Sequence, residues 1–114
     1  MEKIKKIKIS EILKNGGATL NSNGDSVNFK NGYQVAKKDC YKLSVKNIDK
    51  ITQAINKLLT EIKKGDFVGV WCESGFCYID ISERVKNLKR ALILGKARKQ
   101  ISVFSWADAT CIYC

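Results

Sequence analysis

The chain of 114 residues contains no histidine and no proline. Without histidine, imidazole chemistry is excluded and no side chain of that kind can act as a base near neutral pH. The phosphate-binding motifs G-x-x-x-x-G-K-[ST] and G-x-G-x-x-G are also missing, and Gly16 and Gly17 follow a predicted helix instead of preceding one. No serine or cysteine has an evident activating partner. These absences predict a protein that is not an enzyme.

One acidic pair is the remaining candidate for catalysis. Asp80 and Glu83 lie close in sequence and beside Arg84, and two carboxyl groups can perform acid and base work. Acidic residues at the start of a helix more often cap it or interact with its dipole. We therefore expect Glu83, next to Arg84, to cap a helix or interact with its dipole.

Long hydrophobic runs are missing too. The N-terminal stretch MEKIKKIKIS is basic, but no apolar segment of signal-peptide length follows it, and no other stretch approaches the length of a membrane span. We expect a cytoplasmic protein with no membrane partner.

Five cysteines are present, an odd number that cannot form a complete set of intramolecular disulfides. Cys72 and Cys77 form C-x4-C, and Cys111 and Cys114 form a terminal C-x-x-C, so four thiolates offer the formula of a structural zinc site. Residues three apart in a strand point to opposite faces, however, and free cysteine is often buried. Packing without metal or other cofactor is our interpretation, with zinc at Cys72, Cys77, Cys111 and Cys114 as the alternative.

Positive charge is abundant. Lysine and arginine number 21 against 11 acidic residues, which gives a formal net charge of +10. Such an excess favours nucleic acid or an acidic protein surface as a partner. A solubilising, lysine-rich surface is the alternative explanation.

The pattern of turns and periodic hydrophobic residues predicts the order helix, four strands, helix, hairpin, helix, hairpin. The first helix is placed either in the segment KIKKIKISEILKNGG, where it stops at Gly16 and Gly17, or, with Ser10 as its cap, after a basic extension of residues 1–9. The expected later elements are two strands around residues 23–25, strands at Tyr33–Ala36 and Cys40–Val45, a helix at about residues 47–64 with an apolar stripe, a hairpin around residues 73–75, a helical region at about residues 80–100 and a hairpin around residues 107–109.

Strands joined by short turns pair antiparallel, so the sequence predicts an α+β fold. We expect a mostly antiparallel sheet built from hairpins, with two or three helices packed on it, in a single globular domain over residues 1–114.

The predicted third helix contains all the arginines and follows a hairpin rich in aromatic residues. Arginine beside aromatic rings is typical of nucleic-acid grooves and protein hot spots. Trp71 is either exposed or covered by a helix, although burial of both Trp71 and Trp106 is the more common arrangement in a small domain. The predicted binding residues are Arg84, Lys86, Lys89, Arg90, Lys96, Arg98, Lys99, Trp71 and Tyr78.

The sequence also resembles a group of small proteins encoded by phages, prophages and plasmids. The resemblance spans most of the chain and consists of NGGATLNSNG, NGYQVA, GVW, YIDIS, an AL-x-L-G-K motif and QISVF. It implies an accessory role such as inhibition of host defence, including anti-CRISPR-like inhibition, in the host cytoplasm, and it carries no site residues with it.

Three binding hypotheses follow. The first is a phage-type protein that inhibits or modulates a host nucleic-acid-handling or defence complex through its basic face, so that its partner is a host protein or nucleoprotein complex. The second is a module that binds nucleic acid directly. The third is a domain that sequesters a small ligand in a pocket lined by Trp71, Tyr78 and Arg84.

Overall fold

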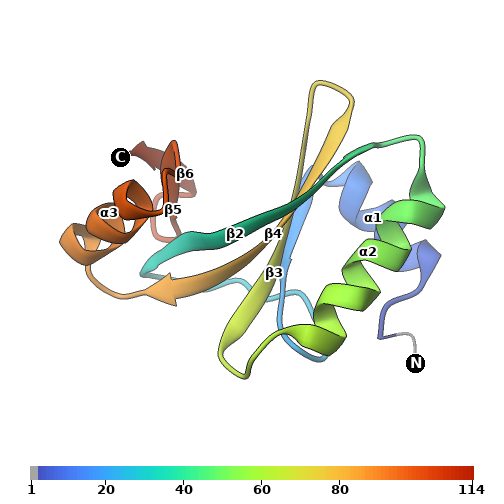
Figure 1. The fold of residues 1–114 in the computed structure, drawn as a ribbon, viewed down its shortest axis with the longest axis horizontal. Helices are drawn as coiled ribbons and strands as arrows, with labels where there is room; N and C mark the ends of the chain where they lie inside the picture. The colour runs from blue at the N-terminus through green and yellow to red at the C-terminus, as the bar shows by residue number, and fades with distance from the viewer. Residues whose placement is uncertain (1–2) are drawn as a thin grey trace.

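The computed structural model describes residues 3–114. Within this range the protein has three helices and one six-stranded, antiparallel, curled sheet with the strand order β1-β3-β4-β2-β5-β6, which confirms the α+β prediction (Figure 1). The elements are α1 (Lys6–Lys14), β1 (Gly17–Leu20), β2 (Tyr33–Ser44), α2 (Ile48–Glu61), β3 (Asp66–Glu73), β4 (Phe76–Val85), α3 (Leu88–Ala97), β5 (Ser102–Ser105) and β6 (Thr110–Tyr113). None of the helices in this range is both long and apolar enough to cross a membrane.

All three helices pack on the same face of the sheet. Alternate residues of β4 that point to this face belong to two hydrophobic clusters, with Ile79 under α1 and α2 and Val85 under α3. The sheet twists between the two clusters, so α1 and α2 lie at one end of the molecule and α3 lies at the other (Figure 1). We call this the helix face, and the opposite side the open face.

The apolar stripe of α2 forms most of the larger cluster, as predicted. Ile51, Ile55 and Leu59 are almost fully buried against β3 and β4. The side chain of Asn47 accepts a hydrogen bond from the backbone amide of Lys50 and so caps the first turn.

At the start of the chain, the helix that ends before Gly16 is confirmed, and the alternative with a basic extension and a cap at Ser10 is wrong. Residues 3–9 do not form an extension, because Ile4 and Ile9 are buried and α1 already begins at Lys6. The side chain of Asn56 on α2 accepts hydrogen bonds from the amides of Lys3 and Ile4 and donates to the carbonyl of Ile4. Ser10 lies within α1 and does not cap it. The part of the predicted extension before residue 3 lies outside the described residues.

The turn predicted around residues 23–25 is present after β1, but the second strand of the predicted hairpin is not formed. Only an isolated bridge joins Leu20 to Ser26, and β1 pairs with β3 instead. The side chain of Asn21 accepts hydrogen bonds from the amides of Asn23 and Asp25, which curls this segment into a local turn.

Two strands predicted separately form the single long strand β2. No turn separates them, because irregularities between Ala36 and Lys38 and between Asp39 and Tyr41 absorb the additional residues as bulges. The hairpin of β3 and β4 and the closing hairpin of β5 and β6 agree with their predictions.

The largest helical error lies between Asp80 and Val85. This segment was predicted to be helical and instead continues β4, paired with β2 on one side and, as far as Glu83, with β3 on the other. Ladder hydrogen bonds on both sides outweigh the local helical pattern, and α3 begins only at Leu88.

Gly17 is required where β1 lies against β3. Its φ angle is +150°, and a Cβ atom there would lie 2.3 Å from the carbonyl oxygen of Val70. Gly65 also has a positive φ angle, but no atom lies within 4 Å of its Cβ position. Alanine substitutions at the two glycines therefore distinguish the cost of a positive φ angle alone from that cost combined with a steric clash.

We expect Gly17→Ala to destabilise the fold more than Gly65→Ala. Gly65→Ala carries only the cost of a positive φ angle, about 1 kcal/mol, and Gly17→Ala adds overpacking against backbone of roughly 1–3 kcal/mol. Urea unfolding monitored by circular dichroism measures both values. Equal destabilisation of the two variants would contradict the predicted clash.

Candidate functional site

The residues predicted to form one binding face are divided between three places in the structure. Arg98 and Arg84 make intramolecular contacts, a group of cations surrounds α3, and Trp71 and Tyr78 lie on the open face far from α3. Arg84 and Tyr78 are six residues apart on β4, which corresponds to roughly 20 Å along a strand. The prediction that Arg84 lies beside Tyr78 is therefore wrong.

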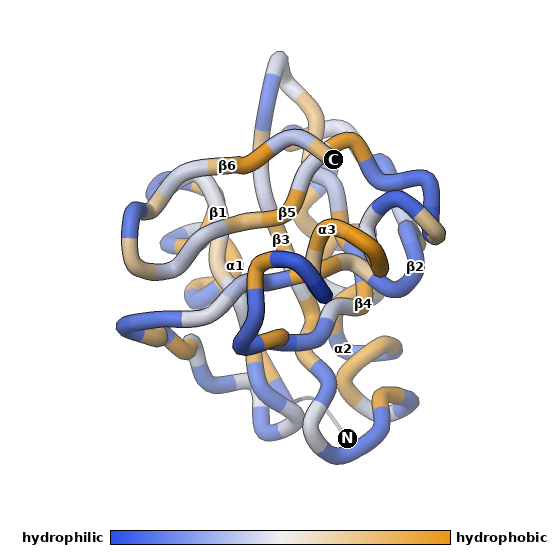
Figure 2. The backbone as a smooth tube through the Cα atoms, turned by 90° about the vertical axis from the view of Figure 1, so that its left-hand side faces the viewer, coloured by the Kyte–Doolittle hydropathy of each residue, from blue (hydrophilic) through white to orange (hydrophobic). Residues whose placement is uncertain are grey.

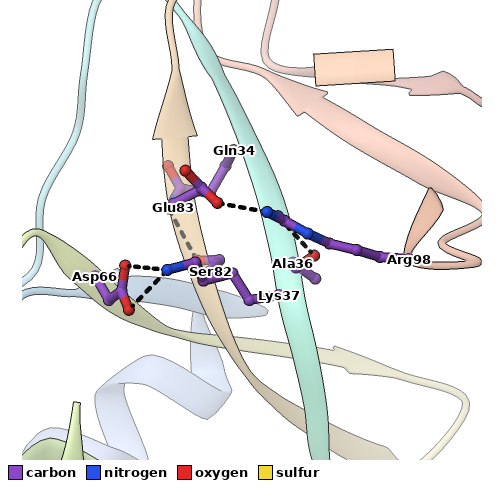
Figure 3. Close-up of polar contacts among 7 residues, drawn as sticks. All are labelled: Gln34, Ala36, Lys37, Asp66, Ser82, Glu83 and Arg98. Carbon is purple, nitrogen blue, oxygen red and sulfur yellow. Dashed lines mark hydrogen bonds and ion pairs between the residues drawn. The ribbon is translucent and has the colours of Figure 1, made fainter. Parts of the chain in front are cut away.

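Arg98 ties the end of α3 to the sheet (Figure 3). One nitrogen of its guanidinium lies 2.7 Å from Glu83 Oε2, and another lies 3.5 Å from the carbonyl oxygen of Ala36. Figure 3 also shows the ion pair of Lys37 with Asp66, at 3.1 Å. The prediction that Glu83 caps a helix or interacts with its dipole is wrong, because Glu83 lies within β4 and pairs with Arg98.

Arg84 fastens the segment between β1 and β2. Its guanidinium donates to the carbonyl and side-chain oxygens of Asn31 and lies 4.7 Å from the ring centroid of Phe29. Gly32 provides the space, since a Cβ atom there would lie 2.9 Å from Arg84 Nε. These contacts give Arg84 a structural function.

The remaining cations form what we call the α3 basic surface. All of them are exposed, and none has a side-chain hydrogen bond or an ion pair with any residue in the range 3–114. The surface consists of Lys86, Lys89, Arg90, Lys96 and Lys99.

Two exposed aliphatic side chains lie among these cations. Ile93 is 59% exposed and Leu88 is 36% exposed, while Ala91 and Gly95 make the buried face of the helix. Figure 2 views the molecule from this side, where the hydrophobic stretch of α3 lies next to strongly hydrophilic segments. The surface thus combines positive charge with apolar area.

The N-terminus of α3 has an unfavourable charge distribution. Its first turn contains no acidic residue and carries Lys89 and Arg90, at the end of a helix that favours negative charge. The side chain of Asn87 caps the turn by accepting a hydrogen bond from the Arg90 amide at 3.0 Å. Cations at this position do not stabilise the helix, which is consistent with a role in binding.

The open face carries an exposed aromatic group. Trp71 and Tyr78 are cross-strand neighbours on β3 and β4, and their rings stack with centroids 4.4 Å apart. Phe76 lies two residues before Tyr78 on β4, and Lys42 Nζ lies 4.5 Å from the ring centroid of Phe76. Trp71 is 45% exposed. The burial that is more common for a tryptophan in a small domain is therefore not found at this residue.

Trp106 is half-buried in a second aromatic cluster. Its ring contacts Phe29 and Phe104 edge to face, and its indole nitrogen donates to Gln34 Oε1 at 3.0 Å. This cluster closes the end of the open face beside β5.

The cysteines are divided between the two faces of the sheet. Cys72 and Cys77 are cross-strand partners on the helix face, and burial and the nearby Cys72 raise the pKa of the Cys77 thiol to about 12. Cys111 pairs with Phe104 on the open face, and Ile112 packs on the opposite side, as the predicted alternation requires. The four thiols of the zinc alternative therefore do not converge, and no cluster of metal-ligating side chains occurs among residues 3–114.

Sequence reasoning did not identify the acidic pair on the open face. Asp80 on β4 lies opposite Asp39 on β2, and burial, together with the negative charge of Asp39, raises the pKa of Asp80 to about 6. A hydrogen bond with the backbone of Gly69 acts in the opposite direction. The sequence suggested Asp80 and Glu83 as an acidic pair, but the alternation of side chains along β4 places Glu83 on the helix face. The only local signal was the strand-like alternation of Ile79 and Ile81.

Comparisons with protein-family models, with curated proteins and with solved structures give no match.

We expect the contribution of Asp80 to stability to depend on pH. Because its pKa is raised in the folded state, the folded protein binds the proton more tightly than the unfolded chain, and stability falls as the pH rises from about 4 to about 6. Asp80→Asn removes this cost and should stabilise the protein at pH 7.5 by on the order of 2–3 kcal/mol.

Urea unfolding at pH 7.5 and at pH 3.5 tests this expectation. The gain from Asp80→Asn should vanish at the lower pH, where the wild-type carboxyl is protonated. Asp25→Asn, in an exposed turn, is the matched control and should have little effect at either pH. A gain of equal size at both values of pH would refute the assignment.

Proposed function

We propose that this is a small, non-catalytic binding protein of the phage or mobile-element type. It inhibits or modulates a nucleic-acid-handling or defence complex of the host, in the manner of an anti-CRISPR protein, and acts in the host cytoplasm. The observation that carries the proposal is the α3 basic surface, whose five cations have no acidic partner among the described residues.

The side chains of α3 favour a nucleoprotein complex as the partner over a partner that offers phosphate groups alone. Uncompensated cations attract a polyanion or an acidic protein surface over long distances. Ile93 and Leu88 add exposed apolar area of the kind that is desolvated at the centre of a protein interface. A nucleoprotein complex offers both kinds of contact.

The resemblance to phage, prophage and plasmid proteins supports the same setting. Proteins of that kind meet host nucleases in the cytoplasm, and a positively charged inhibitor has two targets there: bound nucleic acid or an acidic patch of the nuclease. The net charge of +10 fits either target.

Direct binding of nucleic acid is the second candidate, favoured by a different observation. Trp71, Tyr78 and Phe76 present aromatic surface on the open face of an antiparallel sheet, and Lys42 lies beside them. Bases stack on such surfaces without sequence preference. Binding to labelled single strands of DNA or RNA that weakens steeply with salt would support this candidate, and absence of binding at low salt would eliminate it.

We expect charge reversal on α3 to abolish inhibition. The variant Lys89→Glu, Arg90→Glu, Lys96→Glu should lower inhibition at least tenfold, measured as phage plaquing on bacteria that carry nuclease-based defence systems and express the protein. The two substitutions near the helix N-terminus introduce favourable charge, so folding should be preserved.

The matched control reverses the same number of charges on the opposite end of the helix face. Lys50→Glu, Lys57→Glu, Lys63→Glu alters three exposed lysines on and just after α2 and should retain inhibition. Equal loss in both variants would point to net charge alone and would contradict a role for α3. Absence of inhibition by the wild-type protein across the defence systems would overturn the proposed function.

A further inference from the structure

A wide groove crosses the open face of the sheet, and its lining extends to Lys8, Glu11 and Ile12 of α1. Its volume is about 1490 Å³, larger than the roughly 300–1,000 Å³ of sites for single small molecules. Small residues from three adjacent strands, Ala36, Gly69 and Ser82, lie at its centre. The size of the groove suits a segment of a polypeptide chain.

Aromatic side chains stand on both sides of this centre. The stacked pair of Trp71 and Tyr78 lies on one side, and Phe104, Trp106 and Tyr113 lie on the other. Tyr113 is 77% exposed and Trp71 is 45% exposed, so both present free ring surface.

The carboxylates of Asp80 and Asp39 lie between the two aromatic groups. Neither forms an ion pair with a cation in the described part of the chain. Asp39 Oδ2 accepts a long hydrogen bond of 3.4 Å from Gln100, and Asp80 is hydrogen-bonded to the backbone of Gly69. Two adjacent carboxylates are thus left without a countercharge.

The charge of the groove is opposite to that of the chain. Its lining contains four acidic residues and three lysines, although the chain carries a net charge of +10. One of the three, Lys42, is engaged with the rings of Phe76 and Tyr78. The acidic lining disfavours the phosphates of a nucleic acid and favours a cationic occupant.

We propose that the groove binds an extended segment of a protein partner and that this segment places an arginine side chain against Asp80, Asp39 and the Trp71–Tyr78 stack. A guanidinium group suits this combination because it bonds carboxylates in bidentate geometry and lies flat on aromatic rings. The proposal does not depend on Lys86, Lys89, Arg90 or Lys96 of the α3 basic surface, although Lys99 of that surface also lines the groove.

Two substitutions separate the charge of the groove from its shape. Asp80→Asn removes the charge and keeps the size of the side chain. Gly69→Ala keeps every charge, but its Cβ atom would lie 2.4 Å from Asp80 Oδ1 and would displace that carboxylate. The φ angle of Gly69 is not positive, so the backbone accepts alanine there.

The test is an array of blocked pentapeptides with central arginine and varied flanking residues, each matched to a peptide with citrulline in its place. Citrulline is a neutral analogue of arginine with almost the same shape. The best arginine peptides are then titrated in solution and followed by tryptophan fluorescence. We expect arginine peptides to bind at least tenfold more tightly than their citrulline partners, and Asp80→Asn and Gly69→Ala each to weaken binding at least tenfold.

Asp25→Asn serves as the matched control and should bind like the wild type, since Asp25 lies outside the groove. Circular dichroism establishes that each variant is folded before titration. Absence of any arginine-dependent binding, equal binding of the citrulline peptides, or displacement of the peptide from Trp71 by single-stranded DNA at physiological salt would overturn the proposal. None of these outcomes bears on inhibition through α3, so the two proposals fail separately.

Discussion

The ladder between β2 and β4 joins ten residue pairs and extends from one end of the molecule to the other. On its helix face, Ile79 contributes to the cluster beneath α1 and α2, and Val35 and Val85 contribute to the cluster beneath α3. The short strands β5 and β6 reach the rest of the sheet only through the first residues of β2. Pairing of these two long strands is therefore the constraint that joins, in one sheet, the parts that carry the two hydrophobic clusters.

The same ladder determines what lies on the open face. The irregularities in β2 shift its register, so that Asp39 comes to lie opposite Asp80 and Lys42 opposite Tyr78. The partner strand β3 adds Trp71 beside Tyr78 and Gly69 beside Asp80. The carboxylate pair and the aromatic pair are thus neighbours because β2 and β3 both pair with β4.

The two candidate surfaces differ in charge and in the way they are built. The α3 basic surface lies on a helix and in the segments that flank it, and its residues are close in sequence. The groove combines residues from several strands and loops, and its acidic residues are few in a chain rich in lysine. One small domain thus carries an acidic hollow and a basic helical surface, which have opposite electrostatic environments.

The sequence determined the elements that depend on local signals. The stripe of α2 and its end before Gly65, the turn at Ser74 and Gly75, and the closing hairpin all follow from periodicity and turn chemistry within a few residues. The order of helices and hairpins was enough to predict an antiparallel α+β fold. The cations around α3 could likewise be identified, because they are neighbours along the chain.

Only the tertiary structure decided the rest, because it depends on contacts between distant segments. Asp39 and Asp80 are 41 positions apart, and nothing near either residue indicates that they meet. Arg84 and Arg98 differ from the exposed cations only in having partners, Asn31 and Glu83, that the fold brings to them. Pairing on both sides of β4 turned a locally helical pattern into a strand, and that pairing separated Arg84 from the aromatic residues it was expected to join.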